Sequence, residues 1–132
     1  MIDRIGMMIQ IVEACPHFAA TYASFLIEWQ EAPYTPEYLV LADFSLYLIA
    51  LLEAGNRQEL DSAFATIERL HKDGDKYVRE AVSIGILESL QNTNLHSTTR
   101  PEQFLHFLRP VSLRYWRKVQ DFWENGTLVT DD

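Results

Sequence analysis

The chain has 132 residues, which is enough for one domain that buries its own core without disulfides or structural metals. Its hydrophobic content of 48% is that of an ordinary globular protein, and its one cysteine, Cys15, excludes an internal disulfide. The net charge of -8 disfavours nucleic acids and anionic membranes as partners, because like charges repel.

The first 31 residues predict two helices separated by a proline. Asp3 is a suitable N-cap for a helix that ends near Cys15, and Pro16 interrupts it. A second helix is expected from Phe18 to about Glu31. The apolar spacing predicts buried stripes in both helices: Ile5, Met8, Ile9 and Val12, then Phe18, Tyr22, Phe25, Leu26 and Trp29.

A third helix is predicted from Pro36 to about Ala54, and it is apolar on almost every side. We therefore expect it at the centre of the domain. Asp43 is the exception, because a buried carboxylate must be paired or hydrogen-bonded. We favour an exposed strip beside Ser45 and Tyr47, or a capping role toward a neighbouring helix, over a functional acid.

Two further helices are predicted to form an antiparallel hairpin. Asn56 and Glu59 have the spacing of a capping box for a helix that ends near Lys72. The turn Asp73–Asp75 then leads into a helix that ends near Asn92. Only a few residues separate the two helices, so they are expected to pack side by side.

The remaining residues predict a loop and two more helices. The polar stretch from Asn92 to Thr99 is the longest expected loop. Thr99 is a plausible cap for a short helix over residues 102–108, and the last helix is expected from Val111 to Asn125.

These patterns predict an all-α protein of about six or seven helices, with no strand of useful length. Residues 1–126 are expected to form the single domain and residues 127–132 a flexible tail. Within the hairpin, Gly85 is expected to let a neighbouring helix, such as the third, come close.

We find no catalytic or metal-binding motif. The four histidines are scattered, Cys15 is better explained as a small core residue, and the glycines form no phosphate-binding loop. An enzyme would need carboxylates that converge in a pocket, such as Asp43 with Glu80 or Glu88. We therefore expect no catalytic residues, no cofactor and no metal.

The acidic residues are concentrated in the first 56 positions, where seven acids accompany one base, Arg4. This half would attract a basic protein, although solubility alone also explains it. No signal peptide is apparent, and the longest apolar run, Tyr38–Leu52, is too short to span a bilayer. We therefore expect a cytoplasmic location without membrane contact.

The pattern Asp75-x-x-Val78-Arg79-x-Ala81 resembles the second half of a HEAT-type repeat. The resemblance implies that Asp75 opens the inner helix, that Val78 packs between repeats and that Arg79 bonds along a stack. No second copy occurs at the repeat period, so no solenoid is expected.

A wider set of motifs covers the C-terminal two-thirds of the chain. They are Leu51-Leu52-Glu53-Ala54-Gly55, Ala63-Phe64, Ile67-Glu68-Arg69-Leu70, Gly74-Asp75-x-x-Val78-Arg79, Gly85-x-Leu87-Glu88-x-Leu90-Gln91-Asn92, Phe107-Leu108-x-Pro110-x-Ser112-x-x-Tyr115-Trp116 and Phe122-Trp123. Together they are similar to a family of small, acidic, all-helical bacterial proteins of undefined biochemistry. Some members of that family serve as immunity proteins beside polymorphic or contact-dependent growth-inhibition toxins. The resemblance implies an interaction protein without catalytic residues.

The sequence therefore favours an immunity protein that binds and neutralises a toxin, expected to be a basic nuclease domain, through an acidic surface. The alternative is a HEAT-like adaptor without catalytic activity. The segment from Glu28 to Glu37 combines acids with aromatic residues, although an ordinary interhelical loop explains it too. The candidate partner-binding residues are Glu28, Glu31, Tyr34, Glu37, Asp73 and Asp75.

Overall fold

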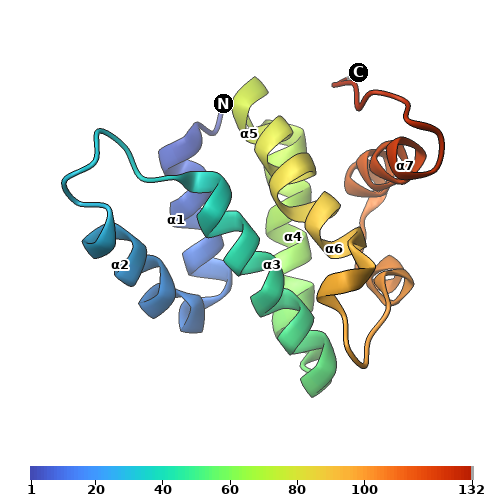
Figure 1. Ribbon diagram of the computed structural model, residues 1–132, viewed down its shortest axis with the longest axis horizontal. Helices are drawn as coiled ribbons and strands as arrows, with labels where there is room; N and C mark the ends of the chain where they lie inside the picture. Colours follow the sequence, from blue (N-terminus) through green and yellow to red (C-terminus); the bar gives the residue numbers. More distant parts are fainter. Residues whose placement is uncertain (132) are drawn as a thin grey trace.

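The computed structural model describes residues 1–131, and helices account for most of them (Figure 1). The α-helices are α1 (Arg4–Ala14), α2 (Ala19–Glu28), α3 (Glu37–Ala54), α4 (Arg57–Asp73), α5 (Lys76–Glu80), α6 (Glu88–Gln91) and α7 (Pro110–Asn125). Short 3₁₀ segments lie at Pro16–Phe18, Thr93–Leu95 and Pro101–His106. Strands are absent from these residues, so the predicted all-α class is confirmed.

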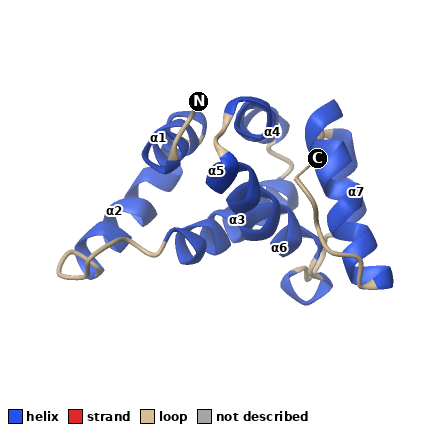
Figure 2. Ribbon diagram, turned by 90° about the horizontal axis from the view of Figure 1, so that it is seen from above, coloured by secondary structure: helices blue, strands red, loops and turns tan. Residues whose placement is uncertain are grey.

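The apolar helix α3 lies at the centre, as predicted, and α2 and α7 lie at opposite ends of the molecule (Figures 1 and 2). Its buried residues include Leu41, Phe44 and Leu48. Gly55 ends the helix in the left-handed conformation, with φ of 70°, which glycine adopts without steric cost. Helix α4 contributes a stripe of Leu60, Phe64, Ile67 and Leu70 to the same core.

The predicted fifth helix is one continuous helix over residues 76–91, but its middle is π-helical. This π segment (Ala81–Leu87) lies between α5 and α6. The N–H of Glu88 donates to the carbonyl of Ser83, five residues earlier. A Cβ at Gly85 would lie 2.8 Å from Cδ1 of Leu41 in α3, so the expected close approach of α3 is confirmed.

The predicted buried face of α1 is only partly correct, since Met8 is buried and Val12 is half-buried. Its buried residues are Met7, Met8 and Ile11, and Ile5 and Ile9 are exposed. Apolar residues occur on both faces of this helix, so hydrophobic spacing does not distinguish the two faces. The Asp3 cap is correct, since its carboxylate accepts from the N–H of Gly6 at 2.9 Å.

The expected exposed strip on α3 is also partly wrong. Asp43 is half-buried, but Ser45 is fully buried. The Ser45 hydroxyl donates to the carbonyl of Leu41 at 2.9 Å and approaches that of Gly85 at 3.3 Å. Tyr47 is half-buried and donates to the Glu59 carboxylate. The polar groups are buried because the neighbouring helices supply their hydrogen-bond partners.

The expected cap at Thr99 is wrong as well. The Thr99 side chain is buried and bonds Nδ1 of His96 at 2.7 Å. The helical segment that follows is 3₁₀ and begins at Pro101, with Arg100 as its N-cap. Proline is well suited to the first helical position, which explains why the cap is Arg100 and not Thr99.

Both ends of the described chain contact the turn between α4 and α5. A β-bridge pairs Ile2 with Gly74. Residues 127–131 have no regular secondary structure and return from α7 toward α5 (Figure 1). Residue 132 of the expected flexible tail lies outside the described residues. In residues 1–131 we find no helix with the length and apolarity that a bilayer crossing requires.

Candidate partner-binding surface

Helix α2 is apolar in composition but buries none of its residues completely. Seven of its ten residues are hydrophobic, and only Tyr22 and Phe25 pack, partly exposed, against the core. Leu26 and Ile27 are 43% and 67% exposed. Contiguous exposed apolar surface of this kind marks sites of interaction with other proteins.

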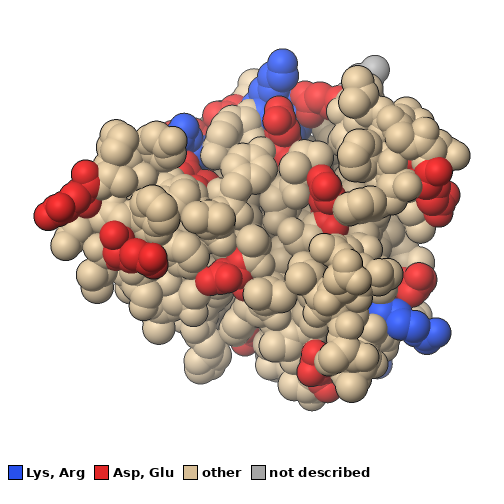
Figure 3. All heavy atoms as spheres, in the orientation of Figure 1, with Lys and Arg blue, Asp and Glu red and all other residues tan. Residues whose placement is uncertain are grey.

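The predicted residues Glu28, Glu31 and Tyr34 lie together at the C-terminal end of α2 and in the loop that follows. All three are exposed, Tyr34 by 65%. Figure 3 shows separate acidic groups at this end of the molecule, with uncharged residues between them. We call α2 with residues 29–36 the N-terminal face.

The buried N–H of the Trp29 indole has no hydrogen-bond partner among residues 1–131. An unsatisfied buried donor costs about 1–3 kcal/mol. Such a group in a native structure calls for an explanation. In the sequence, Trp29 lies between Glu28 and Glu31 and belongs to the N-terminal face.

A tyrosine-lined pocket of about 440 Å³ borders this face. Nε of Arg4 forms an ion pair with Glu37 at 2.9 Å, and its guanidinium lies 5.1 Å from the ring centre of Tyr77. Tyr77 in turn packs edge-on against Tyr38 at 6.4 Å. Glu37 is therefore neutralised by Arg4 and orients the wall of the pocket.

Asp73 and Asp75 belong to a different part of the structure. The Asp75 carboxylate accepts from the N–H of Val78 at 2.9 Å and caps α5. The Asp73 carbonyl accepts from the N–H of Ile2 at 2.8 Å. These contacts organise the turn and the N-terminus. Of the six candidate residues, the structure therefore brings together Glu28, Glu31 and Tyr34, and Glu37 lies at the edge of this group.

The sequence reasoning missed Tyr38, Tyr77 and Ile27. Tyr38 follows Glu37 directly and Tyr77 lies in the first turn of α5, so neither has a local pattern that links it to Tyr34. The available signal was the run of apolar residues that continues to Ile27 and is followed by the acids of the loop. Amphipathic spacing placed Leu26 inside instead.

A buried polar network joins α4, the π segment and α7. Nδ1 of His71 lies 2.8 Å from Oγ of Ser112, and Nε2 lies 3.1 Å from Oγ of Ser83. The imidazole stacks on Tyr115 with ring centres 4.3 Å apart. Burial disfavours the charged ring and lowers the pKa of His71 to about 4, although Glu68 acts in the opposite direction.

Glu68 caps the first turn of α7 from the side. Its carboxylate accepts from the N–H groups of Ser112 at 2.8 Å and Val111 at 3.1 Å. Desolvation alone would raise the pKa of Glu68, but these hydrogen bonds outweigh it and hold the pKa below its ordinary value. The network thus fastens α7 to α4 at the N-terminal end of α7.

The contact between Ser83 and His71 has the distance of a nucleophile and its base. Only 1% of Ser83 is exposed, although the residue borders a pocket of about 570 Å³, and its contact with His71 joins the π segment to α4. The carboxylates considered for an enzyme do not line one pocket, since the largest described pocket includes Glu80 and Glu88 but not Asp43. No group of three potential metal ligands occurs within residues 1–131.

Comparison with known families gives one match. Residues 8–124 match a family described as a domain of unknown function, DUF7674. The match spans α1 through α7 except for a few residues at the two ends. No curated protein and no solved structure matches the chain.

Proposed function

Because the chain belongs to the DUF7674 family, a domain of unknown function, we propose its role from its surface: it is an immunity protein. It binds and neutralises a basic toxin domain, a nuclease, inside the cytoplasm of the producing cell. The observation that carries the proposal is the N-terminal face, where the apolar but unburied α2 is followed by exposed acids.

The chemistry of this face suits a basic protein partner. Leu26 and Ile27 supply apolar area that becomes buried on binding, and Tyr34 is an aromatic anchor of the type common at binding hot spots. Glu28 and Glu31 increase the association rate with a cationic partner. A nuclease carries such a cationic cleft because its substrate is a polyanion.

The test is coexpression with the protein encoded by the neighbouring open reading frame. We expect the wild-type chain to restore growth of cells that make this toxin. The double variant Glu28→Lys/Glu31→Lys is expected to bind the toxin at least tenfold more weakly and to lose protection. The matched control is Asp61→Lys/Glu124→Lys, which reverses two exposed acids on α4 and α7 and should behave as wild type.

Titration calorimetry at low and raised salt separates the two parts of the proposal. Affinity that falls with salt in the wild type, and less in the double variant, supports steering by Glu28 and Glu31. Binding that is unaffected by both salt and charge reversal would refute the acidic contribution. A neighbouring gene whose product is not toxic would count against the immunity role itself.

The second candidate is an adaptor of the HEAT type. It is favoured by Asp75, which caps the helix over residues 76–91 as the HEAT-like pattern implies. An adaptor would use the N-terminal face for a partner whose expression alone does not arrest growth. Growth protection therefore distinguishes the two functions.

A further inference from the structure

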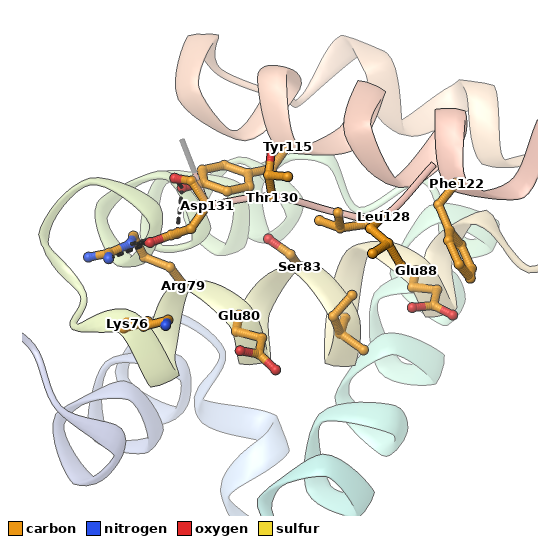
Figure 4. Close-up of a pocket in the computed structure, with 12 residues that line it drawn as sticks. Lys76, Arg79, Glu80, Ser83, Glu88, Tyr115, Phe122, Leu128, Thr130 and Asp131 are labelled. Carbon is orange, nitrogen blue, oxygen red and sulfur yellow. Dashed lines mark hydrogen bonds and ion pairs between the residues drawn. The ribbon is translucent and has the colours of Figure 1, made fainter. Parts of the chain in front are cut away.

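The tail over residues 127–131 lies along a groove between α5, the π segment and α7. This tail groove has a volume of about 570 Å³, and the tail forms part of its wall (Figure 4). Val129 is half-buried against the core, and Asp131 reaches Arg79 at one end of the groove. The body of the groove lies inside the family match, whereas the tail lies beyond residue 124.

The groove binds the Asp131 carboxylate with specific geometry. Nε of Arg79 donates to Oδ1 at 2.9 Å and Nη2 donates to Oδ2 at 2.6 Å, so the guanidinium holds both oxygens. Nη1 of Arg79 donates to the carbonyl of Gly74 at 2.7 Å, which orients the guanidinium from the other side. The Gly74 carbonyl therefore fixes the position of the Arg79 guanidinium independently of the tail.

Two more hydrogen bonds bind backbone carbonyl groups of the tail. The Tyr115 hydroxyl donates to the Asp131 carbonyl at 3.0 Å, and Nζ of Lys118 donates to the Thr130 carbonyl at 3.0 Å. Main-chain contacts do not depend on side-chain identity, so they would accept another segment of similar conformation.

The tail also shows which of its side chains contact the protein. In an extended segment, residues two positions apart point to the same side. Val129 packs against the core and the Asp131 carboxylate bonds Arg79, although Asp131 is exposed, as Leu128 and Thr130 are. The minimal pattern is an aliphatic residue followed two positions later by a carboxylate.

The tail leaves part of the groove unfilled. Ile84 and Phe122 line the open part together with Glu88, as Figure 4 shows for the last two. Within residues 1–131 Glu88 makes no hydrogen bond or ion pair, and burial raises its pKa above the ordinary value. A longer segment could therefore make contacts in this groove that the tail does not make.

We propose that the tail groove binds an extended segment of another protein that carries an aliphatic residue followed two positions later by Asp or Glu, and that residues 127–131 occupy the groove until they are displaced. The site is separate from the N-terminal face, since α2 and α7 lie at opposite ends of the molecule (Figure 1). It also differs in chemistry, because the Arg79 guanidinium and the charge of Lys76 stabilise the bound carboxylate, whereas Glu80 and Glu88 line the rest of the groove.

The experiment uses the full chain and a labelled, end-capped peptide with the sequence of residues 125–131, followed by fluorescence anisotropy. In the wild type the attached tail competes at a high effective concentration, so binding of the free peptide is weak. The variant Asp131→Lys places a cation against Arg79 and releases the tail. We expect it to bind the peptide at least tenfold more tightly than the wild type, and Arg79→Gln in the same chain to abolish that gain.

The controls separate recognition from folding. Glu124→Lys reverses an exposed acid on α7 and should bind the peptide as the wild type does. If Asp131→Lys lowers the melting temperature, Asp131→Asn replaces it, because it removes the ion pair that holds the tail without adding a cation beside Arg79. A peptide with Asn in place of its Asp is expected to bind at least tenfold more weakly.

Three results would overturn the proposal. The first is a folded Asp131→Lys variant that does not bind the peptide, and the second is equal binding of the Asp and Asn peptides. The third is a wild-type dimer in sedimentation that Asp131→Lys dissociates, since the segment would then come from a second copy of the chain.

Discussion

His71 is an imidazole held neutral between two serine hydroxyls in the interior. A neutral ring donates through one nitrogen and accepts through the other, which suits contacts to Ser112 and Ser83. Protonation would require a charged ring to stay buried against Tyr115, with Arg114 adding repulsion. Acid should therefore loosen the junction between α4, the π segment and α7.

Stability is expected to fall as the pH drops from about 6.5 toward 4. His71 titrates near its ordinary pKa of 6.5 in the unfolded chain but near 4 in the folded protein, so the unfolded state binds more protons in this range. The full difference corresponds to about 3 kcal/mol of unfolding free energy, present above pH 6.5 and lost on acidification. Urea titrations at pH 7.0 and 4.5 measure it.

The comparison variant is His71→Gln, which should lose stability at pH 7 but show a smaller decrease between the two pH values. His17→Gln, an exposed site, should retain the wild-type pH dependence. Parallel pH profiles of wild type and His71→Gln would show that the buried imidazole does not govern this range.

Gly74 is required by close approach of backbone atoms. Its φ of -70° suits any residue, but a Cβ would lie 2.3 Å from the carbonyl oxygen of Leu70 and 2.5 Å from Cγ1 of Val78. Gly74→Ala should therefore lower the unfolding free energy by roughly 3 kcal/mol, the upper range for overpacking. Thermal melting with Ser62→Ala as an exposed control on α4 checks it, and an unchanged melting temperature would contradict the geometry.

At the scale of elements, the π segment explains how α3 packs so closely. Wider helical turns leave carbonyl groups without their usual partners four residues on. The Gly85 carbonyl is approached by the hydroxyls of Ser45 at 3.3 Å and Ser89 at 3.2 Å. The absent side chain at Gly85 and the polar Ser45 on α3 therefore form one complementary contact.

Gly85→Leu should disrupt this contact. The new side chain would meet Leu41, and overpacked cores lose roughly 1–3 kcal/mol or more. We expect a lower melting temperature in circular dichroism. Ala50→Leu, at an exposed position of α3, adds the same side chain without the contact and should melt near the wild type. If both variants melt together, α3 and the π segment do not pack as closely as the structure shows.

At the scale of the whole molecule, local chemistry accounts for the elements that were predicted correctly. Asp3 and Asn56 cap helices through their own side chains, and Gly55 ends α3, so each signal lies within a few residues of its effect. The strongly amphipathic α4 likewise identifies its inner face.

Features that depend on distant partners were not predictable in this way. The buried face of α1 depends on which neighbours cover it, since both faces are apolar. The ion pair between Arg79 and Asp131 joins residues 52 positions apart, and no local sequence pattern predicts it. The same holds for the candidate site. Glu28 and Tyr34 are close in the sequence and could be grouped from it, whereas Tyr77 is distant in the sequence and lines the same pocket as Tyr34 only in the folded structure.

The turn around Gly74 holds both ends of the described chain. Ile2 exchanges backbone hydrogen bonds of 2.8 Å with Asp73 and Asp75, and Arg79 bonds the Gly74 carbonyl and Asp131 together. The contacts of Ile2 and of Asp131 each close a loop of fifty residues or more, which carries a large entropy cost and favours late assembly. Amide exchange at Asp75 would therefore report the release of the N-terminal end, because the Asp75 N–H donates to the Ile2 carbonyl.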